Sequence, residues 1–274
     1  MAQIRNLFNR AGRRLLKTRW FAPLIKEVIL ENKEPAQPPI EIGDCGTKNL
    51  ATREIWLEKT LSNIPAGGRI LDAGAGQLKY KPLCSHLTYV SQDFAQYNGQ
   101  GDGKGLQVGA WNQSRLDIVS DISQIPEPDA SFDAVMCIEV LEHVPYPVDA
   151  LRELARLLKP GGQLIVTAPF CSLTHYAPYF YQTGYSRYFY EYWLAQLNFE
   201  IMDIQHNGNY FEYIAQEVRR IPDVSSQYAG IQIGEEGYLA IHQMLGMLNS
   251  LSEKGDGSRE FLCYGMQVLA RKKN

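Results

Sequence analysis

The stretch "ILDAGAGQLKY", residues 70–80, places an acid and two closely spaced glycines at the end of an apolar run. Asp72 is the acid, and Gly74 and Gly76 follow it with one residue between them. Because glycine has no Cβ, the backbone N–H groups of such a turn are open to the charged end of a ligand. A tight turn is one interpretation, and a cofactor lying across the end of a sheet is the other.

Strands and helices alternate on both sides of this stretch. Strands are expected at 69–73, 87–93, 115–121, 132–140, 163–169, 199–205 and 260–271. Helices are expected at 49–64, 147–162, 210–220 and 236–252, with a helix or turn at 77–86. Strands joined by helices predict an open, mostly parallel α/β sheet. The carboxyl ends of parallel strands meet at one edge of such a sheet, and ligands bind there.

Three of these strands have an aspartate at or near their carboxyl end. Asp93 ends the second strand, 21 residues after Asp72, which is about the spacing at which a carboxylate accepts bonds from ribose hydroxyls. Asp121 ends the third strand and precedes Ile122, where an acid and a backbone N–H can recognise adenine. An aspartate after a strand is often only a cap or turn residue, but three in succession favour a nucleoside site. A dinucleotide is disfavoured, because Lys79 stands where the third glycine of that motif belongs.

Five segments carry more specific patterns: "ILDAGAGQ", "QDF", "SDI", "SFDAVMCIEVLEHVPYP" and "LLKPGGQLIVTAP". In this order they resemble the class I S-adenosylmethionine-dependent methyltransferases, from about residue 50 to 205 and again at 260–271. The resemblance implies an enzyme with a Rossmann-like α/β fold, whose seven-stranded, mostly parallel sheet has an antiparallel last strand and helices on both faces. The chain departs from the family at Leu78, where a third glycine is frequent.

The resemblance also implies a site for S-adenosyl-L-methionine. Its methionine part is expected at Asp72, Gly74 and Gly76, its ribose at Asp93, its adenine at Asp121 and Ile122, and its sulfonium beside Glu139. Further cofactor contacts are expected at Ala73, Gln77 and Phe94. No metal is expected, and the cofactor brings the activated methyl group with it. The protein then mainly positions an acceptor and, where needed, removes its proton.

Two histidines at strand ends are candidates for that base. His143 follows the fourth strand and His175 follows the fifth, and imidazole accepts protons near neutral pH. We expect one of them to act as the base, with His175 nearer the acceptor and His143 nearer the sulfonium. A structural role for His143, and catalysis by proximity alone, are the alternatives.

The segment 176–193 holds ten of the thirty aromatic residues of the chain. Tyr176 and Tyr179 are expected to line the substrate pocket. Arg187 is expected either to meet an acidic substrate group or to pair with Glu191. Helical spacing predicts a core-facing set further on, formed by Tyr185, Tyr188, Phe189, Tyr192 and Trp193. The glycine-rich segment 98–114 is expected to fold over the cofactor edge or against a neighbouring segment.

Composition excludes other classes of protein. The formal net charge of −3 gives no basic field for a nucleic-acid backbone, so no nucleic-acid partner is expected. The five cysteines are scattered without a CxxC or Cys/His cluster, which predicts neither a zinc site nor disulfides and favours a cytoplasmic location. No apolar run is long enough to span a bilayer, and no secretory signal is recognisable.

Residues 1–30 form a separate predicted element. They carry seven basic side chains, one acid and apolar residues at helical spacing, which predicts a basic amphipathic helix. Such a helix either contacts a membrane surface peripherally or packs on its own domain or on a second subunit, as in a homodimer. Residues 31–48 are predicted as a linker and 49–274 as the methyltransferase domain, with an aromatic substrate or lid segment at 170–195 and a helical insertion at 207–255.

The expected function is transfer of a methyl group from S-adenosylmethionine to a hydroxyl or amine of a small-molecule acceptor. Relatives in sugar, polysaccharide or secondary-metabolite pathways suggest such acceptors by resemblance only. One alternative is an enzyme that transfers another part of the cofactor, although the acidic pocket motif expected for it is missing. The other is a non-catalytic S-adenosylmethionine-binding scaffold or membrane adaptor that acts through residues 1–30.

Overall fold

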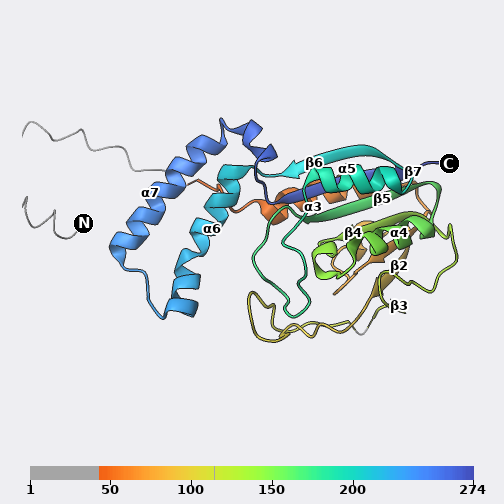
Figure 1. Cartoon of the computed structure of the whole chain (residues 1–274), viewed down its shortest axis with the longest axis horizontal. Helices are drawn as coiled ribbons and strands as arrows, with labels where there is room; N and C mark the ends of the chain where they lie inside the picture. The colour runs from red at the N-terminus through yellow and green to blue at the C-terminus, as the bar shows by residue number, and fades with distance from the viewer. Residues whose placement is uncertain (1–42, 114) are drawn as a thin grey trace, which may run out of the picture. The chain divides into compact units, whose positions relative to one another are not determined.

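The computed structural model describes residues 43–113 and 115–274, which are built around a seven-stranded sheet (Figure 1). The strands are β1 (Arg69–Ala73), β2 (Thr88–Asp93), β3 (Ile118–Val119), β4 (Phe132–Ile138), β5 (Leu158–Pro169), β6 (Phe199–Asn207) and β7 (Gly265–Lys272). Their order is β3-β2-β1-β4-β5-β7-β6. β7 pairs antiparallel with β5 and β6, and the other pairs are parallel. The predicted Rossmann-like sheet with an antiparallel last strand is confirmed.

Helices cover both faces of this sheet because successive strand residues point to opposite faces. Ile70 packs with Leu57 of α3 (Asn49–Ser62) on one face. Leu71 lies on the other face, in one cluster with Leu154 of α4 (Pro147–Leu157) and Tyr190 of α5 (Arg187–Gln196). The strand order reverses between β1 and β4, which places the topological switch point beside the glycine turn.

Two helices beyond β6 form the predicted helical insertion. α6 (Tyr210–Val224) and α7 (Glu235–Ser252) lie side by side in Figure 1. Their contact is a small apolar cluster that contains Ala215, Val218, Leu245 and Leu248, together with Cys45 from the end of the predicted linker. Residues 1–30, and the linker up to residue 42, lie outside the described residues. No helix in the described part of the chain is long and apolar enough to cross a bilayer.

Some predicted elements are shorter than expected. β3 contains only Ile118 and Val119, because Asp117 instead accepts bonds from the N–H and hydroxyl groups of Ser91, at 2.9 and 2.7 Å. The segment 77–86 holds only the short 3₁₀ helix η1 (Lys81–Cys84). Leu78 has a φ of 63°, a left-handed conformation through which a right-handed helix does not continue.

The aromatic set predicted to face the core is partly wrong. Tyr188 and Tyr192 are 63% and 59% exposed, whereas Tyr190 is fully buried. α5 begins only at Arg187, and its register turns Tyr190 toward the sheet. Tyr185 precedes the helix but is buried, and its hydroxyl donates to a backbone carbonyl.

Replacing Leu57 by alanine is expected to lower the free energy of unfolding by about 2–5 kcal/mol, because the side chain is fully buried between α3 and the sheet. Ile55 on the same helix is 67% exposed, so Ile55→Ala is the matched control and should change stability by no more than about 0.5 kcal/mol. Chemical denaturation measures both. Equal losses in the two variants would contradict the placement of α3.

Candidate active site

A cavity of about 960 Å³ opens at the carboxyl ends of β1, β2 and β4. The predicted cofactor residues that line it are Asp72, Gly74, Gly76, Gln77, Asp93, Phe94, Asp121, Ile122 and Glu139. Ala73 is fully buried and is not among the lining residues. The fold therefore gathers nearly all of the predicted cofactor residues at the edge where ligands of such sheets bind.

The glycine turn after β1 leaves no room for side chains. Gly74 and Gly76 have φ values of 82° and 51°, in the left-handed region that favours glycine. A Cβ on Gly76 would lie 2.8 Å from the ring of Trp111. The N–H groups of Gly74 and Ala75 both donate to the Gln92 carbonyl at 2.9 Å, which ties the turn to β2. The turn thus presents bare backbone to the cavity, as the methionine part of the predicted cofactor requires.

Asp93 is held in one orientation at the end of β2. Its carboxylate accepts the N–H groups of Gly76 and Ala95, each at 2.9 Å, and the side-chain amide of Gln113 at 3.0 Å. The two backbone bonds fix the carboxylate, while the Gln113 amide sits on a flexible side chain that ribose hydroxyls can displace. The arrangement fits the predicted ribose contact.

Asp72 is a buried acid beside the glycine turn. The hydroxyl of Tyr89 donates to it at 2.5 Å. Burial raises the pKa of Asp72 to about 7, and the nearby Asp93 charge acts in the same direction. A bound ammonium group would favour the ionised form, so Asp72 suits the amino end of the predicted cofactor.

Asp121 has a local role in addition to the predicted adenine contact. It is exposed, and one carboxylate oxygen accepts both the N–H and the hydroxyl of Ser123, at 2.8 and 2.7 Å. These bonds stabilise a turn, which is the alternative role that the sequence analysis gave for an aspartate after a strand. Ile122 is buried beside it and still lines the cavity.

Glu139 has a partner that sequence reasoning missed. Its carboxylate forms an ion pair with Arg53 of α3 at 2.7 Å and accepts the Thr167 hydroxyl at 2.8 Å. Glu139 also has a φ of 55°, an uncommon backbone conformation of the kind that clusters at functional sites. Arg53 lies far away in sequence within a helix of ordinary composition, so no local signal marks it.

His143 and His175 are brought together, with ring centroids 4.7 Å apart. His143 lines the cavity, whereas His175 is not among the lining residues. Burial lowers the pKa of both imidazoles, that of His143 to about 4, with the His175 ring as the second cause for His143. Both rings are therefore neutral near pH 7. Which of the two lies nearer the acceptor stays a prediction.

Two of the three predicted substrate residues line the cavity. Tyr176 stacks on Tyr97 with centroids 4.8 Å apart, and Tyr179 meets Phe94 edge-on at 5.0 Å. Arg187 is not among the residues that line this cavity. It pairs with Glu191 at 3.8 Å, as the alternative predicted, and also with Glu260 at 3.3 Å.

The glycine-rich segment folds against a neighbouring segment, as expected. Leu106 forms a β-bridge with His175. The N–H of Leu106 donates to the carbonyl of Thr174 at 3.0 Å, and the carbonyl of Leu106 accepts the N–H of Tyr176 at 2.9 Å. A Cβ on Gly101 would lie 1.9 Å from the carbonyl oxygen of Ala177, so only glycine permits this approach. The loop thereby holds His175 in place.

Comparisons of sequence agree with this geometry. Residues 71–166 match the family model of a methyltransferase domain. A ubiquinone biosynthesis O-methyltransferase from Xanthomonas axonopodis pv. citri is 34% identical over 116 residues, which cover 38% of this chain and 44% of that protein. The protein of the same name from Xylella fastidiosa strain M23 is 43% identical over 106 residues, covering 37% and 42%. The chain thus spans less than half the length of these curated relatives.

Solved structures show the same fold. A SAM-dependent methyltransferase from Archaeoglobus fulgidus has a TM-score of 0.50 and 15% identity, covering 82% of this chain and 94% of that one. The [4+2]-cyclase SpnF has a TM-score of 0.50 and 19% identity, covering 92% of each chain. Residues 71–166 are thus similar to a methyltransferase domain and to the matching segments of curated O-methyltransferases, and the two solved structures share the fold of the chain.

Proposed function

We propose that the protein transfers the methyl group of S-adenosylmethionine to a hydroxyl oxygen of a small, planar, largely apolar acceptor. One observation carries the proposal: a single cavity joins the glycine turn and Asp93 to an aromatic wall and to His143. The curated relatives of residues 71–166 are O-methyltransferases, which supports oxygen over nitrogen as the acceptor atom.

Different residues of the chain would bind different parts of the cofactor. The turn at Gly74 and Gly76, with Asp72 beside it, would hold the methionine part. Asp93 would accept the ribose hydroxyls, and Ile122 would contact the adenine. When bound, the cofactor supplies a methyl group already activated on a sulfonium, so the protein has to position the acceptor and manage its proton.

The acceptor side of the cavity is aromatic. Tyr97, Trp111, Tyr176 and Tyr179 line it, and their rings contact one another or Phe94. Such a wall favours a flat aromatic acceptor over a sugar, whose hydroxyls would need many polar partners. His143 lines the same space, and because burial lowers its pKa to about 4 the ring is neutral near pH 7 and does not repel a cation.

A panel of acceptors tests this function. The protein is incubated with S-adenosylmethionine labelled in the methyl group and with matched phenols, catechols, anilines and monosaccharides. We expect label in the phenols or catechols and none in the others. Labelling of amines alone would contradict O-methylation. Tight cofactor binding with no product from any acceptor would favour the non-catalytic scaffold.

Cofactor affinity is expected to fall as the pH falls through 7. The folded-state pKa of Asp72 is raised to about 7, so the carboxyl becomes protonated below this pH and loses its attraction for an ammonium group. The dissociation constant should therefore be about tenfold higher at pH 5.5 than at pH 7, by proton linkage. Calorimetry at a series of pH values measures it. Asp72→Asn should flatten the profile, and an unchanged profile in that variant would contradict the assignment.

A further inference from the structure

The Glu142 carboxylate is fully buried within the described part of the chain. The residue follows β4 in the short 3₁₀ helix η2 (Leu141–His143), and its exposed fraction is 0%. Among the described residues, neither carboxylate oxygen forms a hydrogen bond with another residue. Buried carboxylates are rarely left in this state, because removing one from water is costly unless a cation or a set of donors compensates.

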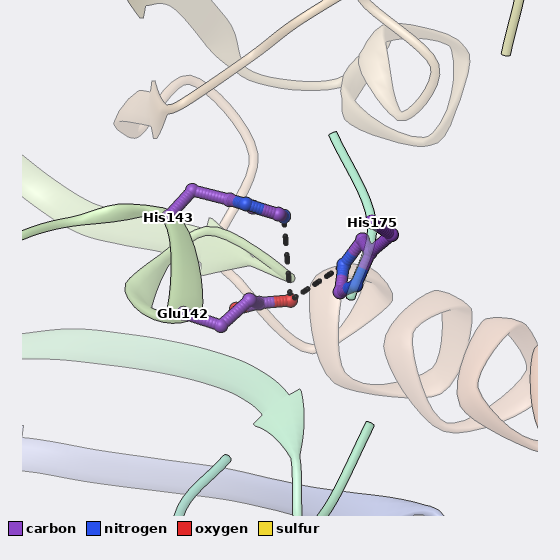
Figure 2. A group of neighbouring side chains, drawn as sticks. All are labelled: Glu142, His143 and His175. Atoms are coloured by element: carbon purple, nitrogen blue, oxygen red, sulfur yellow. Dashed lines mark ion pairs between the residues drawn. The ribbon is translucent and has the colours of Figure 1, made fainter. Parts of the chain in front are cut away.

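Two imidazole nitrogens face this carboxylate (Figure 2). Nε2 of His143 lies 3.8 Å from Oε1 of Glu142, and Nε2 of His175 lies 3.9 Å from the same oxygen. The Nδ1 atoms of both rings point at backbone carbonyls, that of Tyr179 at 2.5 Å and that of Leu173 at 2.8 Å. A carbonyl only accepts, so Nδ1 carries the proton in both rings and each Nε2 presents a lone pair toward Glu142.

We propose that Glu142, His143 and His175 bind a divalent transition-metal ion. The three ligand atoms all lie within 4.8 Å of one another. Two donors about 2.1 Å from one ion lie at most about 4.2 Å apart, so both carboxylate–imidazole distances fit and small side-chain rotations complete the site. Two imidazole nitrogens and one carboxylate favour zinc-like ions over magnesium or calcium, which prefer oxygen ligands.

The ligands are already oriented for this role. Proteins fix a metal-binding histidine by bonding its other ring nitrogen to a carbonyl or carboxylate, and both rings here have that bond. The His143 ring stacks on Tyr176 at 5.2 Å, and the His175 ring packs against Phe180 at 5.0 Å. The backbone carbonyl of Glu142 accepts two N–H groups from residues 181 and 182, which joins the two segments that supply the ligands.

The position of the site suggests a role for the ion in catalysis. This role rests on the proposed methyl transfer, whereas binding of the ion does not. His143 borders the cavity, so the free coordination positions of the ion would face the acceptor. A divalent ion lowers the pKa of a hydroxyl bound to it, and the proton then leaves to water.

Metal binding is tested on the full chain, stripped with a chelator and without S-adenosylmethionine. Calorimetry with Zn²⁺ should show one ion per chain, and Co²⁺ should give visible absorption bands that report nitrogen ligands. Glu142→Gln keeps the shape of the side chain and should weaken Zn²⁺ binding about 100-fold or more. His175→Ala, at a partly exposed residue, should do the same and provides a second variant if the first does not fold.

His206→Ala is the matched control, since His206 also lies 3.8 Å from a carboxylate, that of Glu260, but outside the cluster. It should leave Zn²⁺ binding unchanged. Three outcomes would overturn the proposal: no stoichiometric ion in the stripped wild type, Zn²⁺ binding as tight as that of the wild type in the Glu142 and His175 variants, or tighter binding of Mg²⁺ than of Zn²⁺. Because no cofactor or acceptor is present, failure here leaves the proposed methyl transfer standing, and the acceptor panel tests that separately.

Discussion

Replacing Asp93 by alanine is expected to weaken S-adenosylmethionine binding by at least about tenfold. The carboxylate would accept both ribose hydroxyls, and each charge-assisted bond contributes about 1.5–3 kcal/mol. The same change also releases the N–H of Gly76 from Asp93, which loosens the turn that holds the methionine part. Isothermal titration calorimetry on the folded variant measures the loss.

Asp117→Ala is the matched control for this experiment. Asp117 also bonds a β2 residue, Ser91, but it is not among the residues that line the cavity. Its loss should leave cofactor affinity within about a factor of two, as for a change away from the site. An Asp93→Ala protein that is folded and binds with wild-type affinity would remove Asp93 from the cofactor site.

Replacing His143 by alanine is expected to reduce turnover of a true acceptor by roughly 10²–10⁴, the usual contribution of a group that manages the acceptor proton. The reduction should come with little change in cofactor affinity, because His143 lies on the acceptor side of the cavity. Steady-state kinetics with a substrate from the acceptor panel, beside calorimetry for the cofactor, separates the two effects.

The companion variant His175→Ala decides how His143 acts. If both imidazoles hold one ion, turnover should fall to a similar degree in both variants, although His175 does not line the cavity. A large loss in His143→Ala with near-normal turnover in His175→Ala would restrict the role to a base at His143 and contradict the shared metal site. Near-normal turnover in both would leave catalysis to proximity.

The cofactor half of the site could be predicted because its signals are local. The glycines after β1 and the acids after β2 and β3 each belong to one strand end. Parallel topology alone brings such ends to one edge, so Asp72, Asp93 and Asp121 could be placed together before any side-chain contact was known. Even there, tertiary packing decided the detail, since the raised pKa of Asp72 depends on its burial.

The acceptor half depended on packing between segments far apart in the chain. The sequence determined that histidines and aromatic residues follow β4 and β5. Only the tertiary structure brought His175 against His143, paired Arg53 with Glu139 and turned Arg187 outward to Glu260. The physical reason is that the spacing of apolar residues indicates which face of a helix or strand is buried. The partner of a buried charge instead depends on which distant segment of the chain packs against that charge. Glu142 shows this most clearly: its place in "EVLEHV" is written in the sequence, but its burial opposite two imidazoles is not.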